Sequence, residues 1–258
     1  MQIPKSFQVG VVTQKLSWTD SLFSIRIKVD SHPFVPGQFT KLALVNDEDE
    51  LVRRAYSIVN SPTDFEQTKE LEFVIVTDLD GKLSPQLHLL EEGDDVYVGL
   101  EGAGFMVPDE IPETASELWL LSTGTGLGPF ISMITEPGFV EQYQKIVLVH
   151  AARLGADLTY KTLIEELAQQ YPQISYVPVV SREDVDGAMS GRIPELLANR
   201  QLESELDLNL DFEKSFIYLC GNPGMVREGI KVLQERGYHK HLRRKSGALC
   251  LRKLLVTI

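Results

Sequence analysis

The chain has little cysteine and no long apolar run. Among its 258 residues there are 2 cysteines, Cys220 and Cys250, too few to hold an iron–sulfur cluster or a zinc site by themselves. Two cysteines also do not indicate a disulfide framework. No stretch reaches the ~18 apolar residues of a membrane span, and the start MQIPKSFQVG has no apolar signal-peptide core. We therefore expect a cytoplasmic protein that does not enter a membrane.

Basic residues are also scarce. Lys+Arg 25 against Asp+Glu 37 gives a net charge of −12, which argues against a general affinity for nucleic acid or anionic membranes. The deficit is uneven, because the segment from His239 to the end has six basic residues and no acidic one. A local cationic patch can therefore form there. Its members are Lys240, Arg243, Arg244, Lys245, Arg252 and Lys253.

Two kinds of catalytic or ligand constellation are missing as well. The five histidines show no metal-ligand spacing, and no Ser/His/Asp triad is evident. What remains is ordinary globular composition, with 43% hydrophobic and 24% charged residues. A chain of this length forms one large domain or two modest ones.

The hydrophobic pattern changes near residue 112. Up to there, short segments rich in β-branched and aromatic residues recur about every 10–20 positions, separated by turn residues. They occupy 7–16, 22–29, 38–45, 55–59, 71–77 and 95–100. This spacing predicts an antiparallel β-barrel or sandwich.

From about residue 114, apolar strand segments alternate with helix-length stretches. The strand segments are 118–122, 146–152, 174–180 and 216–221. The clearest helix is 157–171, with Asp157 as its expected N-cap. This alternation predicts a doubly wound parallel α/β sheet. We therefore predict two domains, 1–112 and 113–258, with Glu101–Glu113 as the linker.

The most informative segment is Leu118–Pro129, LWLLSTGTGLGP, where an apolar strand runs into a Gly-rich turn. A helix is expected to begin near Pro129, and backbone N–H groups at such a start favour an anion such as a pyrophosphate. The spacing G-x-G-x-G-P matches neither the dinucleotide fingerprint nor the P-loop. A simple tight connection therefore remains the alternative to a phosphate site.

The segment Arg54-Ala55-Tyr56-Ser57 also has two interpretations. An aromatic ring can stack on a planar cofactor while the adjacent arginine holds a phosphate. Alternatively, Tyr56 covers a barrel face and Arg54 pairs with one of the acidic residues at 47–50.

In the segment Asp80–Pro85, a turn leads into a short helix with Ser84 as its expected N-cap. Ser84 can serve only to cap this helix. Alternatively, the free N–H groups at the helix start can bind a phosphate.

Arginines and a cysteine follow the predicted strands of the second half. Arg153, Arg182 and Arg192 come after strands or in their loops, at the sheet edge where ligands bind in open α/β folds. They can hold a phosphate ester through bidentate contacts, or be solvated surface residues. Cys220 ends the last strand, before Gly221-Asn222-Pro223, and is either a small buried hydrophobe or part of a site.

The order of these segments resembles that of the ferredoxin/flavodoxin–NADP⁺ reductase family, most closely its bacterial short-chain branch. The resemblance spans about residues 4 to 245 and is carried by the blocks VRRAYSIVNSP, DGKLSP, STGTGLGPF, VHAAR, SGRIPELL, CGNPGMV and HLRRK. It implies an FAD-binding barrel followed by an NADP-binding α/β domain. It also implies an oxidoreductase that exchanges a hydride with NADP(H) and passes single electrons to a ferredoxin or flavodoxin.

The resemblance implies site residues for both cofactors and for the catalytic positions, with no metal ligand. The catalytic positions are Ser57, near the reactive nitrogen of the flavin, and Cys220, near the nicotinamide. The implied FAD residues are Arg54, Ala55, Tyr56, Ser57, Val74, Ile75, Val76, Thr77, Lys82, Leu83 and Ser84. The implied NADP residues are Thr125, Ala152, Arg153, Ser181, Arg182, Arg192, Asn222, Pro223 and Gly224.

The chemistry of the residues agrees with that function. Hydride transfer belongs to the cofactors, so no acid–base constellation is needed. Arginine rather than an acidic residue near the ribose favours NADP over NAD. We expect a monomer that docks its carrier through Lys240, Arg243, Arg244 and Lys245. The alternatives are the reductase component of an oxygenase and a non-catalytic flavin-binding subunit.

The end of the chain departs from the family pattern. Members of this branch end in a polar segment that closes with an aromatic residue, often Tyr-Trp, whereas Ser246 onward reads SGALCLRKLLVTI. One interpretation is an apolar terminal strand. Alternatively, the segment is out of frame. Codons can be chosen for Ser246 onward so that, when the first base is skipped, they translate as Pro-Gly-His-Tyr-Val-Ser-Glu-Asn-Tyr-Trp followed by a stop codon. We therefore hypothesise that residues 246–258 result from a one-base insertion, which resequencing of the 3′ end of the gene would test.

Overall fold

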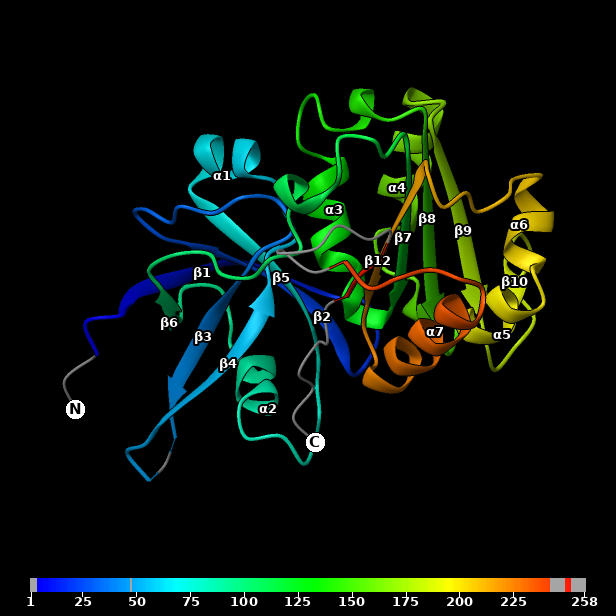
Figure 1. The fold of residues 1–258 in the computed structure, drawn as a ribbon. Helices are drawn as coiled ribbons and strands as arrows, with labels where there is room; N and C mark the ends of the chain where they lie inside the picture. The colour runs from blue at the N-terminus through cyan, green and yellow to red at the C-terminus, as the bar shows by residue number, and fades with distance from the viewer. Residues whose placement is uncertain (1–3, 47, 242–248, 252–258) are drawn as a thin grey trace. The chain divides into compact units, whose positions relative to one another are not determined.

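The computed structural model describes residues 4–46, 48–241 and 249–251. These residues form two compact units (Figure 1). The first unit comprises the described parts of Met1–Val107 together with Gly128–Pro137. The second comprises Pro108–Leu127 and the described parts of Gly138–Val256. The chain therefore enters the first unit twice, the second time at Gly128.

The first unit is built on one antiparallel six-stranded sheet with the order β4-β3-β6-β1-β2-β5. Its strands are β1 (Phe7–Ser17), β2 (Leu22–Lys28), β3 (Phe39–Val45), β4 (Leu51–Ser57), β5 (Glu70–Val76) and β6 (Asp95–Gly99). One side of the curved sheet encloses an apolar core that includes Phe23, Leu42, Phe73 and Val98, none of them exposed. This agrees with the period-2 alternation expected of strands that bury one face.

The two edge strands of this sheet meet just after β4. The Val59 N–H donates to the Glu72 carbonyl at 2.8 Å, and the side chain of Asn60 bonds to the backbone of Glu70 and Glu72. The sheet therefore closes into a barrel, as expected from the spacing of its strands. Between the two edges lies α1 (Pro62–Thr68), which the hydrophobic pattern did not predict. Ser61 caps it by accepting from the Asp64 N–H at 3.2 Å.

The second unit is built on a parallel six-stranded sheet with the order β10-β9-β8-β7-β11-β12. Its strands are β7 (Glu117–Thr123), β8 (Lys145–Ala152), β9 (Ile174–Val180), β10 (Met189–Ser190), β11 (Ser215–Cys220) and β12 (Leu249–Leu251). The chain builds outward from β7 to β10 and then returns to β11, on the other side of β7. The strand order therefore reverses between β7 and β11, the point at which ligands bind in such folds.

Helices cover this sheet. The α-helices described in this unit are α4 (Lys161–Gln170), α5 (Ile193–Ala198), α6 (Gln201–Leu206) and α7 (Pro223–Glu235). Single 3₁₀ turns lie at Pro108–Glu110, Gly124–Leu127, Val140–Gln142 and Gly155–Asp157. Buried residues of α5, α6 and α7 share one core with β7, β8, β9 and β11, while α4 packs on β9. Figure 1 shows β7, β8 and β9 side by side, in register with one another.

Two predicted helix starts are wrong. The helix expected from Asp157 begins instead at Lys161, after Tyr160 in the left-handed region. Asp157 ends the preceding 3₁₀ turn, where its carboxylate accepts from the Leu154 N–H at 3.3 Å. In the first unit, Ser84 is the first residue of α2 (Ser84–Leu89), and Leu83 occupies the cap position without a capping side chain.

The predicted fold class, an antiparallel barrel followed by a parallel α/β domain, is confirmed. The domain boundary at 112/113 stays a prediction. Within the C-terminal segment, Leu249–Leu251 pair in parallel with β11, and residues 242–248 and 252–258 lie outside the described residues. Among the helices described, none is long and apolar enough to span a membrane.

The barrel contains a buried histidine that predicts acid sensitivity. His32 is 2% exposed, and neither ring nitrogen has a hydrogen-bond partner within the described residues. Its ring packs edge-on against Phe34 and Phe65. Burial lowers the pKa of His32 to about 4, because the charged form is poorly solvated there.

We expect the free energy of unfolding to fall as the pH drops from about 6.5 to about 4. In that window the unfolded chain binds a proton at His32 that the folded chain excludes, which costs up to about 3 kcal/mol. Urea titrations at several pH values should show a weaker pH dependence for His32→Leu. His239 is exposed, so His239→Leu is the matched control and should keep the wild-type pH dependence. Equal dependence in His32→Leu and wild type would contradict this account.

Candidate functional site

The end of β4 carries a buried hydroxyl without a partner. Ser57 is 7% exposed, and its Oγ forms no hydrogen bond within the described residues. The preceding Tyr56 is largely buried, and this burial raises the pKa of its phenol to about 12. Tyr56 is therefore neutral at physiological pH. A buried hydroxyl without a partner carries a free-energy cost that a bound ligand can remove.

Arg54 and Ala55, on the same strand, are exposed. The Arg54 guanidinium donates to the Arg53 carbonyl at 2.8 Å and forms no salt bridge within the described residues. The structure thus gives no support to a pair between Arg54 and Glu48, Asp49 or Glu50, and Asp47 lies outside the described residues. The hydrogen-bonding fork of Arg54 is therefore accessible to an anion.

The last residues of β5 face alternate sides of the sheet. Ile75 is 1% exposed and belongs to the barrel core with Phe73, whereas Val76 is 47% exposed. Only the backbone of Ile75 can therefore contact a ligand on the side of Val74 and Val76. The Thr77 hydroxyl, just beyond the strand, hydrogen-bonds to Nδ1 of His88 at 2.7 Å.

The loop between β5 and α2 is held together by hydrogen bonds to the backbone of Asp78. The Ser84 hydroxyl accepts from the Asp78 N–H at 3.0 Å, and the Gly81 N–H donates to the Asp78 carbonyl at 2.9 Å. Leu83 is 1% exposed and anchors the loop in the barrel core. Lys82 is exposed. Of the three predicted phosphate-binding residues here, Lys82 presents its side chain, while Leu83 and Ser84 shape the loop.

Helix α3 (Gly128–Ile134) lies over these strand ends in the first unit. A Cβ at Gly128 would be 3.3 Å from Val59 Cγ2, 3.6 Å from Ser57 Cβ and 3.8 Å from Val74 Cγ1. The start of α3 is thus in van der Waals range of two residues predicted to line a flavin. Sequence reasoning did not single out Gly128 or Val59.

In the second unit, the loops that follow β7 and β11 pack backbone against backbone. A Cβ at Gly126 would lie 2.6 Å from the Cys220 carbonyl oxygen and 2.7 Å from Gly221 Cα. Gly221 has φ +130, and a Cβ there would lie 2.1 Å from Thr123 Oγ1. These loops occupy the carboxyl edge at the point where the strand order reverses, so glycine is required for this close approach.

Thr123 and Asn222 join the two loops. The Asn222 N–H donates to Thr123 Oγ1 at 2.8 Å. The Asn222 side chain accepts from the Gly224 N–H at 2.8 Å and thereby caps α7, which begins at Pro223. Cys220 is fully buried beside them, and Thr125 is partly buried. Sequence reasoning missed Thr123, although its place inside the Gly-rich segment was a signal for it.

Two of the three predicted phosphate-binding arginines lie on neighbouring strand ends. The Arg182 N–H donates to the Arg153 carbonyl at 3.0 Å, and the Ser181 N–H donates to the Ala152 carbonyl at 3.2 Å. Arg192 precedes α5, next to Gly191, whose N–H donates to Val180 at 3.0 Å. All three arginines are exposed, and none forms a salt bridge within the described residues. The structure thus places them along one edge of the sheet.

Gly126→Ala should lower the free energy of unfolding by about 1–3 kcal/mol, because the new methyl group collides with backbone atoms that cannot move aside. Urea denaturation measures this loss. The control is Gly229→Ala in α7, where a Cβ would meet the two methyl groups of Leu219, Cδ2 at 3.4 Å and Cδ1 at 3.6 Å. That substitution should be neutral or stabilising, because alanine favours helix. A Gly126→Ala variant as stable as Gly229→Ala would refute the close approach of the two loops.

Comparisons with known proteins place this arrangement in a family. Residues 120–229 match the family model described as oxidoreductase NAD-binding domain. The chain is 47% identical over 220 residues to the flavodoxin/ferredoxin–NADP reductases of Shigella flexneri and Escherichia coli strain K12, covering 85% of this chain and 86% of each relative. It also resembles the crystal structure of a ferredoxin NADP⁺ reductase from Neisseria gonorrhoeae with bound FAD and NADP, at 28% identity, TM-score 0.88, and 96% and 98% coverage of this chain and that one. The resemblance expected from the order of the motifs is confirmed: the chain belongs to the flavodoxin/ferredoxin–NADP reductase family.

Proposed function

We propose that this protein is an FAD-dependent oxidoreductase that exchanges a hydride with NADP(H) and passes electrons to a ferredoxin or flavodoxin. The observation that carries the proposal is the buried Ser57 hydroxyl without a partner, beside the largely buried ring of Tyr56. The Ser57 hydroxyl can hydrogen-bond to the edge of a planar, polar ring, and the Tyr56 ring can stack on the face of that ring. The names of the related reductases support the same assignment.

The residues of the first unit fit FAD. Tyr56 offers an aromatic face for stacking, and the Ser57 hydroxyl can donate to or accept from a flavin ring atom. The exposed side chains of Arg54 and Lys82 supply positive charge for the pyrophosphate. When bound, FAD supplies a hydride acceptor that also releases electrons singly, which is chemistry that no side chain here provides.

The residues of the second unit fit NADP(H). The exposed guanidinium groups of Arg153, Arg182 and Arg192 can hold a ribose 2′-phosphate through charge-assisted hydrogen bonds. The paired loops around Gly126 and Gly221 present backbone close to the ligand at the carboxyl edge. We assign the nicotinamide end to this edge, with Thr125, Asn222, Pro223 and Gly224 at its border. The catalytic role of Cys220 there stays a proposal.

The carrier, the compartment and the assembly state stay predictions. We propose a cytoplasmic monomer whose carrier docks near the basic C-terminal segment. Lys240 is exposed, and Arg243, Arg244 and Lys245 lie outside the described residues. The names of the relatives support a flavodoxin or ferredoxin as the carrier.

Anaerobic addition of NADPH, and separately of NADH, to the purified yellow protein tests the proposal. Rapid bleaching by NADPH and slow bleaching by NADH are expected, since only NADPH offers a 2′-phosphate to the arginines. Subsequent oxidation by an added flavodoxin or ferredoxin tests the carrier step. A colourless protein, or one that neither nucleotide bleaches, would refute the function. Bleaching without carrier oxidation would restrict it to the nucleotide half-reaction.

Arg182→Gln should raise KM for NADPH about tenfold and leave KM for NADH unchanged. The loss of one charge-assisted hydrogen bond costs about 1.5–3 kcal/mol, and NADH does not use it. Steady-state reduction of a small dye measures both constants. Arg200→Gln removes an exposed arginine next to α6 and should change neither. Equal increases for NADPH and NADH in Arg182→Gln would place Arg182 away from the 2′-phosphate.

A further inference from the structure

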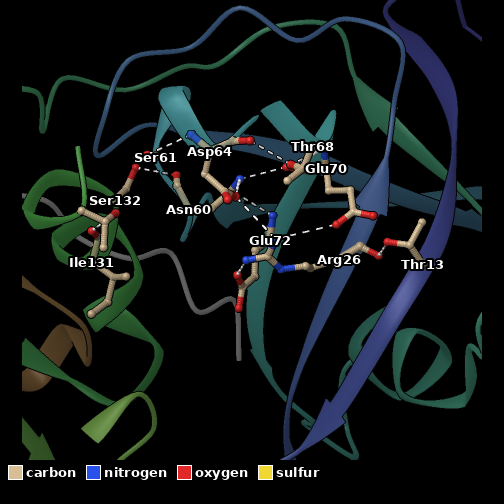
Figure 2. A network of polar contacts seen from close by, with 11 residues as sticks. Thr13, Arg26, Asn60, Ser61, Asp64, Thr68, Glu70, Glu72, Ile131 and Ser132 are labelled. Carbon is tan, nitrogen blue, oxygen red and sulfur yellow. Dashed lines mark hydrogen bonds and ion pairs between the residues drawn. The ribbon is translucent and has the colours of Figure 1, made fainter. Parts of the chain in front are cut away.

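Asn60 is the centre of a polar network in the first unit (Figure 2). Its Nδ2 donates to the Glu70 carbonyl and to the Asp64 carboxylate, both at 2.8 Å. Its Oδ1 accepts from the Glu72 N–H at 2.8 Å. Its own carbonyl accepts from the Ser132 hydroxyl at 2.8 Å. One residue therefore links the β4 end, β5, α1 and α3.

The centre of this network is buried, and its charged members are partly exposed. Asn60 is 6% exposed and Ser132 is fully buried. Arg26 lies among three carboxylates, with N–O distances of 2.8 Å to Glu72, 3.4 Å to Asp64 and 3.7 Å to Glu70. Buried hydrogen bonds such as those of Asn60 and Ser132 fix the relative positions of the elements that they join. A buried donor or acceptor that loses its partner cannot form a replacement hydrogen bond with water, so breaking such a bond is costly.

A second link attaches the far end of α3 to the same unit. The Glu136 carboxylate, two residues beyond α3, accepts from the Thr63 hydroxyl at 2.8 Å and from the Thr63 N–H at 3.1 Å. Thr63 belongs to α1, which Asp64 connects to Asn60. Ser132 and Glu136 thus attach α3 and the residues directly after it at two points, four positions apart in the chain.

These two links set the position of the start of α3. Gly128 is one turn before Ser132, and a Cβ added to it would be within 3.8 Å of side-chain atoms of Ser57, Val59 and Val74. Because a helix is stiff over so short a length, a shift at Ser132 moves Gly128 with it. The residues beneath Gly128 include Ser57, which the proposed function gives to the flavin, and Val74, which the family resemblance implies as a flavin-lining residue.

We propose that Asn60, Ser132 and Glu136 are positioning residues of the flavin site. They fix the end of β4 against β5 and hold the start of α3 over Ser57, so that the flavin is held in one orientation. None of the three touches the flavin in this account. The inference rests on the proposed function, since it concerns the same FAD site.

Ser132→Ala tests the proposal, with Ser122→Ala as its matched control. Both serines are fully buried, and each donates to a backbone carbonyl, Ser132 to Asn60 and Ser122 to Val149 at 2.9 Å in the second unit. The two substitutions should cost similar stability. Only Ser132→Ala should shift the flavin absorption band, weaken FAD binding and slow NADPH bleaching about tenfold, as expected for a small displacement of a reacting ring.

Two variants of Glu136, Glu136→Ala and Glu136→Gln, test the proposal even if Ser132→Ala fails to fold. Glu136→Ala removes both acceptors and should reproduce the shifted band and the slow bleaching. In Glu136→Gln the amide oxygen can still accept from the Thr63 N–H, and the amide nitrogen can donate to the Thr63 hydroxyl. This variant should therefore behave as wild type does. KM for NADPH should change less than the bleaching rate in Ser132→Ala and in Glu136→Ala, since both substitutions lie in the first unit.

The failure of this proposal differs from the failure of the proposed function. If wild type binds FAD and is bleached, but Ser132→Ala matches Ser122→Ala and Glu136→Ala matches Glu136→Gln, the positioning role is overturned alone. If wild type binds no FAD, the function and this inference fall together.

Discussion

The closure of the barrel between β4 and β5 is the constraint on which the first unit depends. A sheet edge presents N–H and C=O groups that need partners, and here the two edges meet through the Val59 N–H and the Asn60 carboxamide rather than through a regular ladder. The side chain replaces backbone pairing for the two groups that it bonds, Glu70 C=O and Glu72 N–H. As a result the chain can turn away after Ser57 into α1 while the barrel stays closed.

The second unit depends on a different constraint, the meeting of two loops at the reversal of strand order. Gly126 and Gly221 let the loops after β7 and β11 approach through their backbones, and Thr123 ties them together. Such an edge offers backbone groups and a helix start rather than acids and bases. This suits an enzyme whose cofactors carry the reaction, and it explains why no catalytic triad or metal cluster was evident in the sequence.

Local signals predicted the strands well and the helix starts less well. Each predicted strand segment overlaps an observed strand, because alternation and apolar runs persist over several residues. Helix α1 was missed although Ser61-Pro62 and Asp64 form a capping sequence, since its single buried residue, Phe65, gives no periodic pattern. Asp157 and Ser84 are good capping residues, yet they serve a 3₁₀ turn and a loop closure instead. For the site, motif order identified candidate residues, but the inward orientation of Ile75 required the observed register.

By itself, the sequence determined the class of each half and the segments that carry chemistry, because hydrophobic period and motif spacing are properties of neighbouring residues. Only the tertiary structure decided which polar groups meet. Ser132 and Asn60 are 72 residues apart in the chain, and Thr123 and Asn222 are 99 apart. Contacts at such separations leave no periodic trace in the sequence, because they form only when strands and helices have packed. The assignment of α3 to the barrel unit has the same origin, since the partners of Ser132 and Glu136 lie 72 and 73 residues earlier in the chain.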